Sequence, residues 1–559
     1  MNNKSHLLQI EKKHFLYITL ILYFIFFHKI THSQTTFNEE IWPMKFISVS
    51  GPILTKGDTI ICLGHGTDYW AYSYYVAYIA KYDIQGDFIN RNVDSLGNPS
   101  YQNITDAYWD KNKIITYVNN ITFEFNGGYF LIIDSNTGEY VKKIKIYFKN
   151  DPDRAVAAEG LCKIDSIHYA ALSSSPYDGY YSNVNIIVSI VNIKTGKVKN
   201  IEIKKDSTYD IPEFIKWTGK KLLVSALSDV TYWDTELQKY ISDYTVSMFE
   251  IDTSGTWKEA YSTKDTTEAN IKKLLINKDK EYICTSFRIK YHTYENERKF
   301  RWHFNVFKLD SNYNRIWEKP WGMDYDFNYY FGQAGILEAE DKDGYILCGY
   351  QPNFPYTKQG YGVWNLSQET VDSMKEAGTI PMTIGVLQKI NEDGDSIWLR
   401  TYSYVNDTSL NFVDHRLKSI IHSPDGGYIM YGHILHTPRP GIDTANQYPG
   451  WLLKVDKYGC LIPGCQDTTD TTSAVDIITD IDIMLYPNPA SDKLYIYQSN
   501  SGDTHYTITD ISGRTIQKWS GNLPNHTYIL DVGRYKPGVY ILAVDREGER
   551  RAEKFVVER

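Results

Sequence analysis

A unit that recurs seven times between residues 41 and 465 constrains the fold more than any other feature. Each copy holds a short apolar run after a turn rich in Gly, Asp or Asn, and a second apolar run that ends in a polar turn. That second turn often carries a glycine, such as Gly394 or Gly459, which permits the positive φ of a tight hairpin. The first runs begin at Gly57, Asn112, Asp165, Gly219, Lys280, Asp343 and Asp425.

Each unit spans about 60 residues, which suits four short strands joined by turns. A single four-stranded blade cannot cover both of its faces, whereas blades stacked around an axis bury them and protect their edges. Aromatic residues make up 15% of the chain, with 47 tyrosines, and this composition favours strands. We therefore predict an all-β protein with a seven-bladed β-propeller. The alternative is a tandem array of β-sandwiches, which would need about 100 residues per repeat.

Residues 1–33 read as a secretory signal peptide. Lys12 and Lys13 precede an apolar run of 13 residues, 15–27, which is shorter than the roughly 20 residues that span a bilayer. Small residues precede a predicted cleavage between Ser33 and Gln34. The alternative is an uncleaved membrane anchor.

The chain ends in a second, smaller β module. Residues 466–482 are rich in Thr and Asp and read as a linker, and residues 483–559 contain short alternating runs typical of strands. The motif residues of the module are Tyr486, Pro487, Asn488, Pro489, Gly538, Tyr540 and Lys554. Together they resemble the type A C-terminal sorting domain of Bacteroidetes type IX secretion cargo. The alternative is an ordinary immunoglobulin-like accessory domain.

The resemblance implies a small immunoglobulin-like β-sandwich that directs export. It implies passage through the Sec and type IX machineries, and then removal of the module. The rest of the protein would be secreted or held at the outer-membrane cell surface, touching the membrane only through that attachment.

Charge and cysteine content narrow the class of protein further. The net charge is −9, and losing residues 1–33, with four lysines and one glutamate, would leave −12. So acidic a chain without a long basic run is a poor nucleic-acid binder. Cys460 and Cys465 flank a Pro-Gly pair, and export to an oxidising compartment favours a disulfide between them over two free thiols.

No catalytic motif stands out, so we expect a protein that is not an enzyme and holds no cofactor or metal. The segment that begins at Asp310 starts like a calcium loop but has Arg315 where the glycine should be. Asp414 and His415 are adjacent in sequence, which does not make a catalytic dyad.

The connections between the second and third strands of the units are rich in aromatic residues. Exposed Tyr and Trp are typical of recognition surfaces, so we predict a binding face for a glycan or protein there. The alternative is that these rings pack the loops against one another. The predicted ligand-binding residues are Tyr69, Trp70, Tyr180, Trp233, Trp302, Tyr361 and Trp364.

Three functions remain open from the sequence. The first is an exported propeller that acts as a binding or interaction module. The second is an exported propeller enzyme acting on polysaccharide or peptide, which carboxylates about 5–10 Å apart at the mouth of the central channel would favour. The third is a structural component of the cell surface.

Overall fold

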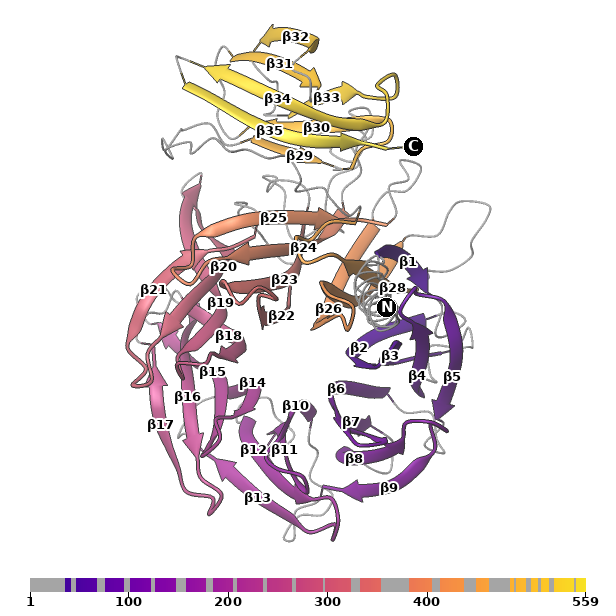
Figure 1. Cartoon of the computed structure of the whole chain (residues 1–559). Coiled ribbons are helices and arrows are strands. Elements are labelled where there is room, and N and C mark those ends of the chain that lie inside the picture. The colour runs from indigo at the N-terminus through magenta and orange to yellow at the C-terminus, as the bar shows by residue number, and fades with distance from the viewer. Residues whose placement is uncertain are drawn as a thin grey trace, which may run out of the picture.

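The computed structural model describes residues 36–41, 47–67, 76–94, 101–121, 126–146, 157–176, 184–204, 209–234, 239–263, 268–294, 297–322, 332–352, 382–404, 413–436, 449–461, 483–486, 489–498, 504–510, 514–521, 527–546 and 549–558. The regular elements in these ranges are β-strands, β1 to β35. Figure 1 shows a ring of small sheets built from β1–β28 and a second body built from β29–β35.

Five four-stranded antiparallel sheets follow one another along the chain, here called blades 1 to 5. Blade 1 contains β2 (Ile47–Lys56), β3 (Thr59–Thr67), β4 (Val76–Asp83) and β5 (Phe88–Asp94). Blade 2 contains β6 (Tyr101–Asp110), β7 (Lys113–Ile121), β8 (Asn126–Asp134) and β9 (Tyr140–Lys145). Blade 3 contains β10 (Ala157–Lys163), β11 (His168–Pro176), β12 (Val184–Asn192) and β13 (Val198–Ile203). Blade 4 contains β14 (Tyr209–Trp217), β15 (Leu222–Asp234), β16 (Lys239–Ile251) and β17 (Trp257–Ser262). Blade 5 contains β18 (Glu268–Ile276), β19 (Tyr282–Tyr294), β20 (Glu297–Leu309) and β21 (Arg315–Pro320).

The last two blades share one eight-stranded sheet. Blade 6 contains β22 (Gly332–Glu338), β23 (Tyr345–Pro352), β24 (Met382–Ile390) and β25 (Ser396–Tyr402). Blade 7 contains β26 (Val413–His422), β27 (Tyr428–His436) and β28 (Gly450–Val455), and its fourth strand is β1 (Phe37–Ile41). A short parallel pairing of β24 with β26 joins the two blades.

The N-terminal strand therefore closes the ring. β1 pairs antiparallel with β28, and Trp451 Nε1 donates a 2.7 Å hydrogen bond to Asn38 Oδ1. Phe37 and Ile41 share a core with blades 1 and 7, where the hydroxyls of Tyr78 and Tyr431 lie 2.5 Å apart. The strand order confirms the predicted seven-bladed propeller, but residue 41 is wrong as its start because the ring already includes Phe37.

The same local turn follows the third strand of every blade, and in blades 1 to 6 it leads into the fourth strand. A side-chain Oδ1 accepts a backbone N–H two to four residues later, as an Asx turn does. The seven acceptors are Asp83, Asp134, Asn192, Asp252, Asp310, Asn391 and Asp456. Glycine follows in six blades, and in blade 5 Tyr313 takes the positive φ of 67° and stacks on Tyr282. Asp310, which looked like the start of a calcium loop, serves as this turn acceptor.

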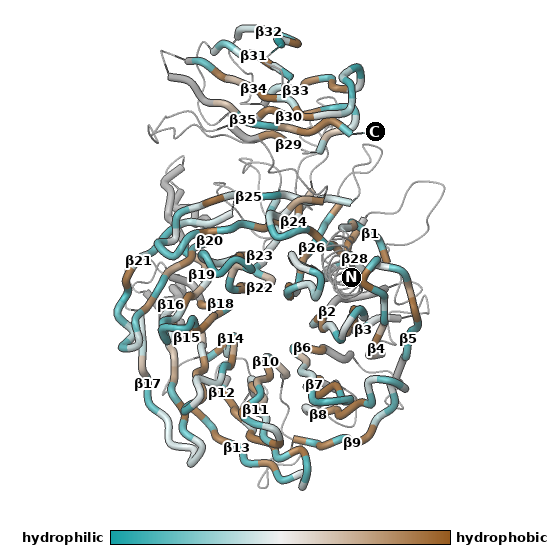
Figure 2. Tube along the Cα trace, viewed as in Figure 1, coloured by the Kyte–Doolittle hydropathy of each residue, from teal (hydrophilic) through white to brown (hydrophobic). Residues whose placement is uncertain are grey.

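Burial is greatest in the two middle strands of blade 6 and lower in its innermost strand β22 and its outer strand β25. In blade 6 every residue of β23 and β24 is buried, whereas β17 and β21 at the rim are half exposed. Figure 2 shows the same trend as hydrophobic colour in the middle strands and hydrophilic colour along β17 and β21. Neighbouring blades share cores, as when Leu172 and Val188 of blade 3 join Val224 and Phe249 of blade 4. Blade stacking therefore supplies the apolar contacts that a single blade lacks.

The C-terminal body is a small β-sandwich, as predicted. One sheet runs β29 (Ile483–Tyr486), β30 (Lys493–Gln498) and β33 (Thr527–Asp531). The other runs β32 (Thr515–Gly521), β31 (Thr504–Asp510), β34 (Gly538–Arg546) and β35 (Glu549–Val557). Residues of both sheets, such as Leu494, Leu530, Tyr506 and Phe555, form one core.

Candidate functional site

The first strand of every blade breaks its pairing with the second strand at the same place. Such a β-bulge leaves an extra residue unpaired and re-aims its side chain. The shifts lie between Ser50 and Ile53 in β2, Ile104 and Ala107 in β6, Ala158 and Gly160 in β10, Pro212 and Phe214 in β14, Ile271 and Lys273 in β18, Gln333 and Gly335 in β22, and Leu417 and Ser419 in β26. These seven strands are the innermost ones, around the axis in Figure 1.

The bulge residues form what we call the axial ring. In blade order they are Gly51 with Pro52, Thr105 with Asp106, Glu159, Glu213, Lys272, Ala334 and Lys418. Five blades thus place a charged, half-buried side chain at this level. Charged residues are rare inside sheets unless they are paired or functional.

Interactions between blades that are not neighbours show that the charged side chains face the axis. Asp106 of blade 2 interacts electrostatically with Lys273 of blade 5. Lys272 of blade 5 interacts in the same way with Lys418 of blade 7. Since at least one other blade separates each pair along the ring, these side chains are close enough to interact across the inside of the ring.

Blades 2 to 4 supply the acidic side of the axial ring. Glu213 is paired, because Lys272 Nζ lies 2.6 Å from both of its carboxylate oxygens. Glu159 accepts a 2.9 Å hydrogen bond from Ser174 Oγ. Burial raises the pKa of Glu159 to about 7, and the neighbouring Glu213 adds to the rise, while the hydrogen bond from Ser174 opposes it. Glu159 is therefore part protonated at neutral pH.

Blades 5 and 7 supply the basic side. Lys418 Nζ lies 5.4 Å from the ring centre of Tyr350, and within the described part of the chain it has no hydrogen-bond or ion-pair partner. Burial lowers the pKa of Lys418 to about 8, and repulsion from Arg416 adds to the decrease. The nearby carboxylate of Asp414 is held by Arg416 Nε at 2.7 Å and by Thr383 Oγ1 at 2.5 Å.

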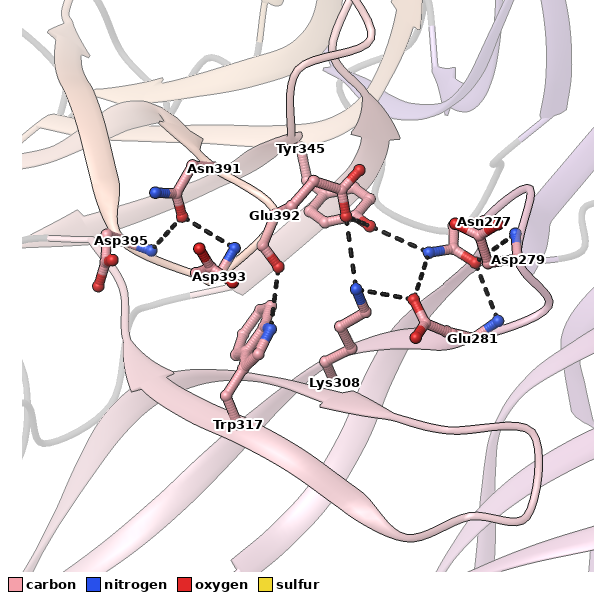
Figure 3. A network of polar contacts seen from close by, with 10 residues as sticks. All are labelled: Asn277, Asp279, Glu281, Lys308, Trp317, Tyr345, Asn391, Glu392, Asp393 and Asp395. Atoms are coloured by element: carbon pink, nitrogen blue, oxygen red, sulfur yellow. Dashed lines mark hydrogen bonds and ion pairs between the residues drawn. The ribbon is translucent and has the colours of Figure 1, made fainter.

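A second charged cluster lies between blades 5 and 6 at the face of the tight turns, centred on Lys308 (Figure 3). Lys308 Nζ lies 2.7 Å from Glu281 Oε2 and 3.4 Å from Glu392 Oε2. Tyr345 donates a 2.5 Å hydrogen bond to Glu392, whose backbone carbonyl accepts Trp317 Nε1 at 3.0 Å. Burial alone would lower the pKa of Lys308, but the two glutamates outweigh it and raise the pKa. This cluster joins two blades, and its one lysine is shared by the two glutamates, so it offers no free cation to a ligand.

The predicted aromatic binding residues lie mostly outside the described residues. These are Tyr69, Trp70, Tyr180, Tyr361 and Trp364. Trp233 and Trp302 were expected in loops, but they belong to strands: Trp233 pairs with Tyr240 in the β15–β16 hairpin, and Trp302 pairs with Ile289 in β19–β20. Both hairpins continue five or six residues beyond the first strand of their blade, about 15–20 Å.

Histidines near the axis are buried in the structure. His65 and His433 have exposed fractions of 3% and 6%. Burial lowers the pKa of both, to about 4 for His65. His415, next to Asp414, accepts the Tyr404 N–H and contacts the Thr383 carbonyl through its other nitrogen. His415 therefore anchors local backbone.

The sorting motif and the end of the chain meet in the C-terminal sandwich. Ala490, just after Pro489, bridges to Val557, and its N–H donates to the Val556 carbonyl at 2.8 Å. Tyr486 lies in β29, whereas Pro487 and Asn488 lie outside the described residues. Tyr540 is buried in β34, which Gly538 begins, and Lys554 lies in β35 opposite Ile541.

Two further predicted sites, the Cys460–Cys465 disulfide and the signal-peptide cleavage site, lie partly or wholly outside the described residues. Cys460 is buried and its N–H donates to Asp456 Oδ1, but Cys465 lies outside the described residues, so the disulfide stays a prediction. Ser33 and Gln34 lie outside them as well. Within the described ranges no group of three or more His, Cys, Asp or Glu could hold a metal ion. The same ranges contain no helix long and apolar enough to cross a membrane.

The axial ring was not predicted from the sequence, although the sequence carries one signal for it. Glu159 is the single charge in the apolar run 157–162, whereas Glu213 and Lys418 lie in first strands that hold other charges as well. Aligning the repeats by their first strands, rather than their second and third, places these charges at one position. The signal is faint because Gly51, Pro52 and Ala334 occupy the same position elsewhere.

Comparison with known protein families identifies the C-terminal module. Residues 484–558 match the family described as a secretion system C-terminal sorting domain. No curated protein matches the chain. A chain in a crystal structure of the mitotic checkpoint complex matches at 7% identity and TM-score 0.38, over 76% of this chain and 93% of that one. A hydrazine synthase chain from Kuenenia stuttgartiensis matches at 11% identity and TM-score 0.36, over 71% and 94%.

Both TM-scores are low, so the propeller assignment rests on the strand order itself. The sorting domain implies delivery to the cell surface or the medium. The chain therefore carries a secretion system C-terminal sorting domain at residues 484–558, and a β-propeller body precedes it.

Proposed function

We propose that the propeller is an extracellular binding module that holds its ligand at the axial ring. The observation that carries this proposal is the bulge shared by all seven innermost strands, which turns charged side chains toward the axis in five of them. A bulge costs ladder hydrogen bonds, and charge at this depth costs solvation. Both costs are easier to account for if the ring makes contacts with a ligand.

The aromatic residues form the rim of the proposed site. The hairpins of β15–β16 and β19–β20 extend from neighbouring blades beyond the start of the first strands, and they carry Trp233 and Trp302. Tyr69, Trp70, Tyr180, Tyr361 and Trp364 would extend this rim from other blades. Tyr and Trp give large contact areas at low entropic cost, which suits a glycan or peptide ligand.

A binding screen with paired variants tests the proposal. Protein beginning at Gln34 is applied to glycan and peptide arrays, beside a Glu213→Gln/Lys272→Gln variant that removes both partners of one ion pair. Because no charge is left unpaired, the variant should fold, and its affinity for the ligand found should fall at least about tenfold. Alanine at Trp70, Trp233 and Trp364 should weaken the same interaction.

The matched control is Lys319→Gln/Asp395→Asn, which removes a 2.8 Å ion pair outside the ring. It should bind like the unaltered protein. A ligand whose affinity is unchanged by the Glu213/Lys272 variant would place the binding site elsewhere.

A second candidate function is hydrolysis of a polysaccharide or peptide. It is favoured by Glu159, whose pKa of about 7 suits a general acid, and by the electrostatic contact of Glu159 with Glu213. If so, Glu159→Gln should abolish release of sugar or peptide fragments while leaving binding intact. Equal turnover by the variant would exclude Glu159 from that role.

The covalent processing of the chain completes the proposal. Cleavage between Ser33 and Gln34 would leave β1 in place to close the ring. A Cys460–Cys465 disulfide would tie down the end of blade 7 just before the linker. Mass spectrometry of the exported protein, with and without reductant, tests both.

A further inference from the structure

Lys418, on the innermost strand β26, has no carboxylate within ion-pair distance in the described part of the chain, and Asp414 acts on it only through a longer-range electrostatic interaction. Lys308, Lys389 and Lys454 are at least as buried, and each lies 2.6–2.7 Å from a carboxylate oxygen. The ammonium group of Lys418 instead lies 5.4 Å from the ring centre of Tyr350. A half-buried ammonium without an acceptor is costly to keep, so such a position commonly serves an anion.

The charged groups around Lys418 sum to a net charge of one positive unit. Lys272 and Arg416 are the other cations that interact with it. Lys272 is neutralised by Glu213 at 2.6 Å, and Arg416 by Asp414 at 2.7 Å. A ligand group with a single negative charge would make this side of the ring neutral.

Blade 6 leaves the position between the two lysines without a charge of its own. Its ring residue is Ala334, between Lys272 of blade 5 and Lys418 of blade 7. Tyr350 of β23, which follows β22 in the same sheet, interacts with Arg416, Asp414 and Lys272. Blade 6 therefore adds no charge between the two lysines, since Ala334 is buried in the apolar core that blades 6 and 7 share.

We propose that the axial ring binds a single carboxylate group between Lys418 and Lys272. This inference rests on the proposed function, that the ring is a ligand site, and specifies the chemistry of the ligand. A dianion such as a phosphate monoester fits poorly, because its second charge would have no cation and would face Asp106 and Glu159 across the ring. A uronic-acid sugar and an acyl amino acid both carry the required group.

Two matched probe pairs test the carboxylate and distinguish its source. Calorimetric titration compares glucuronate with glucose, and an N-acetyl amino acid with its amide. We expect at least one acid to bind and its neutral partner to bind at least about tenfold more weakly, since a charge-assisted contact is lost. The acid that binds identifies the source as saccharide or peptide.

The Lys418→Met variant then tests whether the carboxylate of the ligand binds to this lysine. Methionine keeps most of the volume and removes the unpaired charge, so the protein should be as stable or more stable while acid binding falls at least about tenfold. Lys308→Met should do the reverse, losing stability because Glu281 and Glu392 lose their cation, and keeping acid binding. Lys197→Met, at an exposed turn, controls for net charge.

The results separate this inference from the function on which it rests. A ligand that needs the Glu213–Lys272 pair but binds equally well without a carboxylate would overturn the inference and leave the binding module standing. Acid binding that survives Lys418→Met would also overturn it. If neither acid binds, the carboxylate chemistry is wrong, whatever the array screen finds.

Discussion

Glu159 illustrates how a single residue couples the ring to pH. Its carboxyl group has a pKa of 4.5 in an unfolded chain and about 7 in the folded protein, mainly because of burial. Between these values the folded state binds more protons than the unfolded state, so stability falls as the pH rises. Above the folded pKa the full cost of the buried charge is present.

We expect Glu159→Gln to stabilise the protein at pH 8 and to be nearly neutral at pH 4.5 or below. The expected gain in the free energy of unfolding is at most about 3 kcal/mol, because one unit of pKa shift corresponds to about 1.36 kcal/mol. Urea unfolding of both proteins at pH 4.5 and pH 8 measures it. A difference that does not change with pH would show that Glu159 is not held in its protonated form.

At the scale of elements, one short strand decides whether the ring closes. β1 adds the fourth strand of blade 7 and buries Phe37 and Ile41 in a core shared with blade 1. Without it, blade 7 would lose its outermost strand and Trp451 would lose the Asn38 hydrogen bond.

We expect a chain that begins after Ile41 to be about 3–6 kcal/mol less stable than one that begins at Gln34, from the lost burial of two large apolar side chains. Thermal unfolding measures the loss, and tryptophan fluorescence should report the greater exposure of Trp451. Equal stability of the two chains would mean that β1 is dispensable for closure.

At the scale of the whole molecule, the propeller and the sorting domain have separate cores. Seven described core clusters draw only on residues of β1–β28 and the adjoining turns, while the cluster with Leu494, Tyr506 and Phe555 lies within the C-terminal sandwich. Among the described residues, removing the sorting domain takes no member from a core cluster of the ring.

Two unfolding transitions should follow from this division. Calorimetry of a chain covering residues 34–559 should show both, and a chain that ends at residue 482 should keep the larger transition at the same temperature. The 75 residues matched to the sorting family should account for the transition that is lost. A lower melting temperature for the shortened chain would indicate that the two bodies stabilise each other.

Local chemistry explains what could be predicted from the sequence. The turns at Asp83, Asp310 and Asp456 use a side-chain acceptor and a residue with positive φ a few positions later, and both lie within five residues of sequence. Apolar runs of strand length flank these turns, so the blades and their number could be counted. The sorting domain was equally visible because its motif begins at Tyr486 and its end at Lys554 has a recognisable pattern.

The fold-level corrections come from pairing between distant residues. β1 reads Phe-Asn-Glu-Glu-Ile, which has no turn signal and gives no hint that it pairs with Leu452 and Trp451. The hairpins that carry Trp233 and Trp302 looked like loops because strand pairing there depends on register between their two arms.

The sequence by itself determined the export route, the all-β class and the sevenfold repeat, because each follows from residues close together in the chain. Only the tertiary structure decided that the first strand closes the last blade and that Asp106, Glu159, Glu213, Lys272 and Lys418 share one ring. The reason is that a bulge exists only where two strands pair, and charges on different blades meet only once the blades surround an axis.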